Sequence, residues 1–197
     1  MLLRVEPPGA SSECYSRRIC CDLPPSRTLD LVVERQQRSQ WCWAAIGASL
    51  ARFYRTGSWS QREIASEVFG VGSCEPKSAD SWDRCATLDD VLRRVGCFSH
   101  WSPGRPTFER VQSEIAAGRP LCLGLAWSDG GNHYVVVRGA FAARRELSVD
   151  DPLHGPSIQH YDSFPMGYRG GGVWRETYWT VSGLESRATN SEERRGE

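Results

Sequence analysis

QQRSQWCWAAIGASLARFY, residues 36–54, is the stretch that most strongly predicts the fold. From Cys42 onward, small and apolar residues recur at helical spacing and form one continuous face, made of Ala45, Ile46, Ser49, Leu50 and Phe53. Cys42 therefore lies in the first turn of a predicted helix, where unpaired backbone N–H groups and the helix dipole favour an anion. This position favours the thiolate, which is the reactive form of cysteine.

Three glutamines precede this cysteine, namely Gln36, Gln37 and Gln40. The side-chain amide of one of them, together with the backbone N–H of Cys42, would form an oxyanion hole for a tetrahedral intermediate. A single cysteine on an apolar helix is also an ordinary core residue. Its chemical interpretation therefore depends on which other residues the chain supplies.

A histidine and a carboxylate follow in the second half of the chain. Residues 130–137 (GGNHYVVV) place His133 at the first residue of an apolar strand, directly after a flexible turn. Asp151 stands before a proline at the end of the next predicted strand, with Asp150 beside it as the alternative. Antiparallel pairing of these strands would bring a carboxylate to the imidazole, fix its tautomer and stabilise the imidazolium.

The first half of the chain is predicted to be helical and the second half to be strands. Further helices are expected after the capping residues Ser60, Thr87 and Thr107, and each ends near a glycine. Short apolar runs between turn residues predict strands at residues 121–127, 133–139, 146–149, 157–161 and 174–181. Helices followed by strands indicate an α+β fold rather than alternating βαβ units.

The length of 197 residues suits one well-packed domain. Residues 1–28 contain two Pro-Pro pairs, several Ser and Arg and no periodicity, so we expect a poorly ordered leader. Residues 29–183 are expected to form the domain, and residues 184–197 a polar tail.

Charge and hydropathy exclude several classes of partner. The 24 basic and 24 acidic residues balance, so no global field attracts nucleic acid or an anionic membrane. No stretch approaches the ~18 consecutive apolar residues of a membrane helix, and the N-terminus lacks the apolar core of a secretory signal. We therefore expect a cytoplasmic protein, although secretion by a route that needs no such signal would leave no trace in the sequence. We also expect a monomer.

The other cysteines predict no metal site. Eight cysteines occur without a CxxC motif, and those near the N-terminus have no neighbouring histidine. We therefore expect no structural zinc ion and no other metal or organic cofactor. Cys74 and Cys85 flank a polar loop and are predicted either as free thiols or, in an oxidising compartment, as a disulfide.

Some aromatic, glycine and histidine residues allow two interpretations. Trp41 and Trp43 flank the cysteine and are expected to pack its helix against the core, while one indole would also shield the cysteine and histidine from water. Residues 170–172, all glycine, predict a loop that either borders a cleft or only connects two strands. No role is predicted for the remaining histidines, His100, His154 and His160.

In their order along the chain, these segments resemble the papain-like cysteine peptidases. The resemblance is to the bacterial branch that contains plant-pathogen effector proteases and is related to bacteriocin-leader peptidases. The matching segments, which span about residues 31–181, are QQRSQWCWAA, SQREIA, GGNHYVVVRG, LSVDDP and GYRGGGVWRETYWT. The resemblance implies a papain-like α+β fold, with an N-terminal helical part packed against a C-terminal antiparallel sheet and the active-site cleft between them.

The resemblance also implies roles for four residues. Cys42 is the expected nucleophile, His133 the base, Asp151 the residue that orients the base, and Gln36, six positions before the cysteine, the oxyanion donor. The implied reaction is hydrolysis of a protein or peptide substrate through a thioester acyl-enzyme. The same residues would also serve glutamine deamidation or another acyl transfer, and a catalytically silent binding domain is the remaining alternative. Delivery into another cell and self-cleavage of the leader are further implications.

Overall fold

The structure is a computed structural model that describes residues 26–70 and 82–182. Its helices are α1 (Cys42–Tyr54), α2 (Gln61–Phe69), α3 (Leu88–Arg94) and α4 (Phe108–Ala116), with a short 3-10 turn, η2 (Ala142–Arg144). The predicted capping box of α2 is confirmed, since Ser60 and Glu63 exchange side-chain and backbone hydrogen bonds. Thr107 caps α4 through its side chain, whereas Thr87 precedes α3 without such a bond.

Within the described ranges, seven strands form one antiparallel sheet. The strands are β1 (Arg27–Thr28), β2 (Phe98–Pro103), β3 (Leu121–Trp127), β4 (Asn132–Phe141), β5 (Glu146–Asp151), β6 (Gly155–His160) and β7 (Gly172–Thr180). Their order is β2-β7-β3-β4-β5-β6, and β1 pairs with β4. Helices followed by an antiparallel sheet make this an α+β fold, as expected.

Two strands were not expected from the sequence. β2 is exposed or half-buried throughout, so its residues show no alternation of apolar and polar side chains. β1 lies in the stretch assigned to the leader, but Arg27 and Thr28 pair with Ala140 and Gly139 of β4. The sheet therefore begins before the expected domain boundary at residue 29. The rest of the expected leader, all of the expected tail and Cys74 lie outside the described residues.

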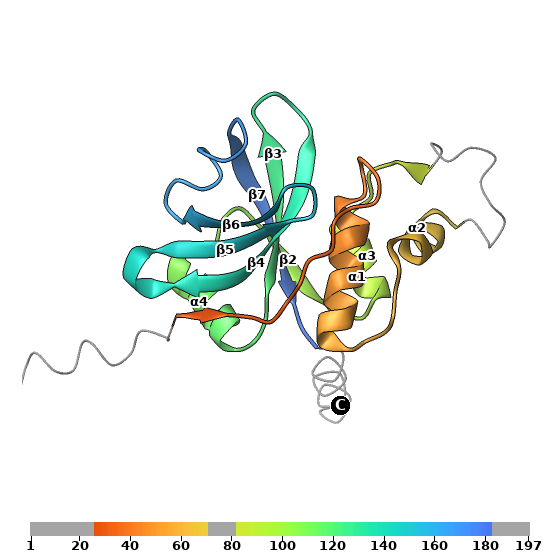
Figure 1. The fold of residues 1–197 in the computed structure, drawn as a ribbon, viewed down its shortest axis with the longest axis horizontal. Helices are drawn as coiled ribbons and strands as arrows, with labels where there is room; N and C mark the ends of the chain where they lie inside the picture. Colours follow the sequence, from red (N-terminus) through yellow and green to blue (C-terminus); the bar gives the residue numbers. More distant parts are fainter. Residues whose placement is uncertain (1–25, 71–81, 183–197) are drawn as a thin grey trace, which may run out of the picture.

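A layer of helices lies against the sheet. Figure 1 shows α1, α2 and α3 together on one side of the molecule, with the segment before α1 running alongside that helix. α1 contacts β4, and α4 contacts β3 and β4 elsewhere on the sheet. The fully buried side chains of Trp43, Ile46 and Leu50 bind α1 into the core, each contributing about 1.5–3 kcal/mol. No helix in the described part of the chain has the length and apolar character needed to cross a membrane.

α1 and α3 approach each other closely at a glycine. A Cβ atom added to Gly47 would lie 2.5 Å from Cγ1 of Val91 on α3, well inside van der Waals contact. The absence of a side chain at Gly47 therefore sets the spacing of the two helices and, with it, the seat of α1 on the sheet.

Candidate active site

Cys42 begins α1 and is 7% exposed. The residue before it, Trp41, occupies the N-cap position but makes no side-chain cap hydrogen bond, and the first turn holds no acidic residue. The N–H groups at this helix start are therefore not consumed by a side-chain cap of the usual Ser, Thr or Asp kind. An anion at the Cys42 sulfur, or beside it, meets unpaired backbone donors and the positive end of the helix dipole.

His133 and Asp151 meet across two adjacent strands. His133 is near the start of β4 and Asp151 ends β5, and the antiparallel register pairs Val136 with Asp150. Because side chains alternate along a strand, this register puts His133 and Asp151 on the same face. Nε2 of His133 lies 2.8 Å from Oδ1 of Asp151, and both residues are buried.

The Asp151 carboxylate has a hydrogen-bond partner on each oxygen. Oδ1 also accepts the backbone N–H groups of Leu153 and His154, at 2.7 and 3.0 Å, while Oδ2 accepts the hydroxyl of Tyr168 at 2.9 Å. Burial by itself would raise the pKa of the Asp151 carboxyl, but His133 and these donors hold it below its ordinary value. Asp151 is thus an ionised acceptor that faces the imidazole in one fixed orientation.

The imidazole of His133 has partners on both sides. Burial alone would lower its pKa, but hydrogen bonds to Asp151 and to the Cys42 side chain, with the negative charges there, raise the pKa of His133 to about 9. Since Nε2 faces Asp151, Nδ1 is the ring nitrogen left for Cys42. A histidine with this pKa is protonated at neutral pH, so the imidazole carries a positive charge and can donate a proton.

The neighbouring carboxylate, Asp150, points elsewhere. Its Oδ1 lies 2.8 Å from Nε of Arg138, with which it forms a partly buried ion pair. Alternation along β5 accounts for the difference, because consecutive side chains of a strand leave it on opposite faces. Of the two candidates, Asp151 is therefore the one that contacts His133.

Of the three candidate glutamines, Gln36 is buried, while Gln37 and Gln40 are exposed. The backbone N–H of Gln36 donates to the carbonyl of Pro152, directly after the end of β5, at 2.9 Å. The side-chain Nε2 of Gln36 donates to the carbonyls of Arg38 and Ser39, at 2.9 and 2.7 Å. Both amide hydrogens thus have acceptors in the turn before Cys42, and Oε1 is buried without a partner among the described residues.

The tryptophan that covers His133 is Trp127, which was not expected from the sequence. Its indole stacks on the imidazole with ring centroids 5.9 Å apart and an angle of 24°. Trp127 lies at the end of β3, whose Leu125 pairs with His133, so the cross-strand register is the signal that would have identified it. Among the described residues, no ring contact joins Trp41 or Trp43 to His133, so the indole that stacks on the imidazole is that of Trp127.

Trp41 and Trp43 pack in the core, as expected, and also make hydrogen bonds. Both are buried, and their indole N–H groups donate to the carbonyls of Trp82 and Arg84, at 2.7 and 3.0 Å. They therefore bind the start of α1 to the segment that precedes α3 by hydrogen bonds that a buried indole requires.

The glycine loop before β7 packs against the residues around Trp127. A Cβ atom at Gly172 would lie 2.8 Å from the carbonyl oxygen of Ala126 and 3.0 Å from the Trp127 ring. The carbonyl of Gly171 accepts the backbone N–H of Ser128 at 3.1 Å. The glycines therefore allow β7 to pass close to the indole that stacks on His133.

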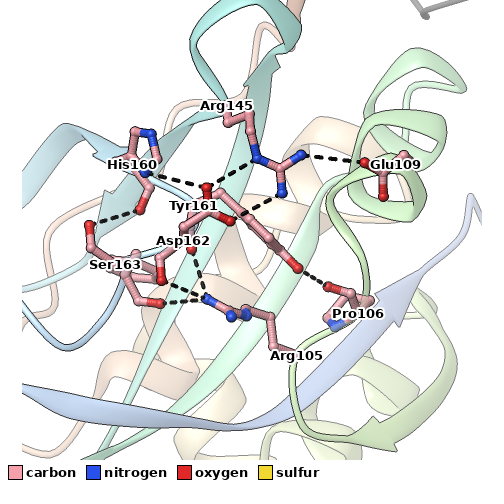
Figure 2. A network of polar contacts seen from close by, with 9 residues as sticks. Arg105, Pro106, Glu109, Arg145, His160, Tyr161, Asp162 and Ser163 are labelled. Carbon is pink, nitrogen blue, oxygen red and sulfur yellow. Dashed lines mark hydrogen bonds and ion pairs between the residues drawn. The ribbon is translucent and has the colours of Figure 1, made fainter.

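A polar network anchors the loop that carries Tyr168, and Figure 2 shows it. Arg145 binds the Asp162 carboxylate through two nitrogens, each 3.1 Å from an oxygen, and also reaches α4. Arg105 donates to the carbonyl of Tyr161 at 2.8 Å and lies over the ring of that residue. These contacts fasten the start of the loop on a rigid part of the fold, and Tyr168 of the same loop reaches Asp151.

We expect Tyr168→Phe to lower kcat/KM about tenfold, because hydrogen bonds to a charged group contribute roughly 1.5–3 kcal/mol. The variant keeps the ring contacts with Trp127 and Phe164 and loses only the donor to Asp151 Oδ2. The measurement is the steady-state rate of the reaction that the site catalyses, with thermal unfolding recorded in parallel.

The matched control is Tyr54→Phe, which removes the hydroxyl that bonds Thr180 and lies on a different part of the fold. It should leave kcat/KM unchanged. Equal activity losses in the two variants would contradict a specific effect of Tyr168 on Asp151.

Comparisons with known proteins give the following matches. A family model, Peptidase_C70, described as papain-like cysteine protease AvrRpt2, matches residues 25–168. One similar solved structure is a double glycine motif protease from an AMS/PCAT transporter in complex with the leader peptide (16% identity, 78% of this chain and 93% of that chain, TM-score 0.48). Another is xylellain, a cysteine protease from Xylella fastidiosa (13% identity, 81% and 87%, TM-score 0.49). No curated protein matches the chain.

Proposed function

Because the chain belongs to the Peptidase_C70 family of papain-like cysteine proteases, we propose that Cys42, His133 and Asp151 are the triad with which it hydrolyses peptide bonds. The observation that carries the proposal is the buried hydrogen bond between Asp151 and His133, together with the Cys42 side chain, which acts on the same imidazole and helps to raise its pKa. A nucleophile, a base and a group that orients the base are what covalent acyl transfer requires.

In the first half-reaction, the Cys42 thiolate attacks the carbonyl carbon of the scissile peptide bond. The carbonyl π electrons move to oxygen and form a tetrahedral oxyanion. His133, protonated at neutral pH, then donates its proton to the leaving amine as the C–N bond breaks. The products are a free amine and a thioester between Cys42 and the acyl part of the substrate.

In the second half-reaction, water replaces the amine. Neutral His133 accepts a proton from the water as its oxygen attacks the thioester carbonyl. The C–S bond breaks, the carboxylic acid leaves, and the thiolate and imidazolium are restored. Asp151 keeps the same imidazole tautomer and orientation in both steps, since its Oδ1 is held by two backbone N–H groups in addition to His133.

The oxyanion is bound first by the backbone N–H of Cys42, because Cys42 is the first residue of α1 and its N–H has no acceptor within the helix. Gln36 supplies the second donor when one of its two amide hydrogens exchanges a turn carbonyl for the oxyanion. Its buried position next to the turn before Cys42 supports this role over Gln37 and Gln40, which are exposed. We assign these steps to one catalytic domain within residues 29–183 that acts on protein or peptide substrates.

The proposal is tested by mass spectrometry of a cell-extract proteome incubated with the purified protein. We expect new peptide termini that increase with time and that are absent when the protein is first alkylated with iodoacetamide. Proteins that stay intact but gain about one dalton would instead indicate glutamine deamidation by the same thioester chemistry, and would overturn peptide-bond hydrolysis as the reaction.

A further inference from the structure

A short segment, residues 82–85, runs beside the turn that leads into α1. Its backbone carbonyls accept the indole N–H groups of Trp41 and Trp43. The thiol of Cys85 lies 3.0 Å from the side-chain oxygen of Gln40. The segment that precedes α3 is therefore hydrogen-bonded to Gln40, Trp41 and Trp43, the residues around the start of α1. None of these bonds involves the triad itself.

Asp83 makes the most specific contacts within this segment. Its Oδ1 accepts the backbone N–H of Gln40 at 2.7 Å, and its Oδ2 accepts the hydroxyl of Ser39 at 2.7 Å. Residues 38–41 form a turn that is closed by a hydrogen bond from the backbone N–H of Trp41 to the carbonyl of Arg38. Ser39 and Gln40 are its two central residues, and the two oxygens of Asp83 bind one each. Burial alone would raise the pKa of Asp83, but these bonds and the nearby Arg38 lower it, so the carboxylate is ionised at neutral pH.

The bond to Gln40 also determines where the opposite side of the same peptide unit points. The carbonyl of Ser39 and the N–H of Gln40 belong to one planar trans peptide and point in opposite directions. Asp83 holds the N–H, and the carbonyl on the other side accepts Nε2 of Gln36 at 2.7 Å. A change in the tilt of this peptide would therefore displace the Gln36 amide directly.

α1 needs such support from outside its own sequence. α2 and α4 are capped by Ser60 and Thr107, but Trp41 at the N-cap of α1 makes no side-chain cap bond. A side-chain cap would bond an N–H further along the first turn of α1 and would require a polar residue in place of Trp41, whose indole bonds the carbonyl of Trp82. Anchoring the preceding turn through Asp83 stabilises the helix start while Trp41 keeps the N-cap position.

We propose that Asp83 is a positioning residue for the oxyanion hole: it fixes the Ser39–Gln40 peptide and, through it, the Gln36 amide and the start of α1. The inference rests on the proposed function, since it concerns the oxyanion donors of that reaction. It predicts that loss of Asp83 impairs attack on a carbonyl group and spares the reactivity of the Cys42–His133 pair.

The test compares two reactions of the Asp83→Ala variant. Cleavage of labelled casein should fall about 10- to 100-fold, because a misplaced oxyanion donor costs about this much. Alkylation of Cys42 by iodoacetamide should stay within about twofold of the wild-type rate, since displacement at a saturated carbon forms no oxyanion and depends on the thiolate alone. Asp83→Asn should restore most of the cleavage, because its side-chain oxygen can still accept the Gln40 N–H.

Two further variants complete the experiment. Ser39→Ala removes one of the two bonds to Asp83 and should lower casein cleavage only a fewfold, which tests the inference even if Asp83→Ala folds poorly. Asp90→Ala removes an exposed carboxylate on α3, paired with Arg94 at 3.1 Å, and should have no effect.

Wild-type cleavage by Asp83→Ala, or a parallel fall in alkylation, would overturn the inference. The proposed function fails separately, if the wild-type protein does not cleave casein or if Cys42→Ala cleaves it equally well.

Discussion

Replacing Cys42 with Ala is expected to remove peptidase activity, with a loss of at least about 10⁴-fold in kcat, because no thioester can form without the sulfur. No other thiol in the described residues is suited to take over. Burial raises the pKa of Cys97 to about 11 and raises that of Cys122 further, so both stay protonated. The pKa of Cys85 is also raised, by burial and by the neighbouring Cys42 and Asp83.

The measurement is casein cleavage at a high enzyme concentration, so that a residual rate is visible. Cys97→Ala is the matched control, since Cys97 is buried in the core away from His133 and contacts Thr56. It should lose some stability, about 1–2 kcal/mol, and keep its kcat at temperatures where it is folded. Full activity of Cys42→Ala would refute the assignment of the nucleophile.

Asp151→Ala is expected to lower kcat/KM about 10³-fold and the free energy of unfolding by about 3 kcal/mol. The change leaves the buried imidazole, two backbone N–H groups and the Tyr168 hydroxyl without their acceptor. It also removes the charge that holds His133 protonated, so the imidazolium needed to protonate the leaving amine is lost.

The pH dependence separates the charge of Asp151 from its shape. In the wild-type protein His133 is protonated below its pKa of about 9, so kcat/KM should fall as the pH rises through about 9. Asp151→Asn keeps an acceptor of similar size but no charge, and burial then lowers the pKa of His133. The alkaline limb of the profile should therefore move to lower pH.

Asp150→Ala serves as the control for both Asp151 variants, because Asp150 pairs with Arg138 on the other face of β5. It should keep most of the kcat/KM and leave the alkaline limb in place. An unchanged limb in Asp151→Asn, or a larger effect of Asp150→Ala, would contradict the role of Asp151 in the triad.

Several elements were predictable because their signal is local. The capping box at Ser60, the helical periodicity after Cys42 and the apolar run of residues 121–127 each appear within a few residues of sequence, and α2, α1 and β3 form there. β2 was missed because its exposed residues carry no such pattern, and β1 because two residues are too few to show one.

The sequence by itself determined the order of Cys42, His133 and Asp151 along the chain and the type of element that carries each. It left open which of two adjacent aspartates faces the imidazole, since their local sequence is the same and only the pairing of β4 with β5 puts Asp151 on the face of His133. The contacts of Trp127, Tyr168 and Asp83 with the site could not be predicted from the sequence, for a related reason. Each meets the site through strand register or a long-range hydrogen bond, and such contacts exist only once distant segments have packed together.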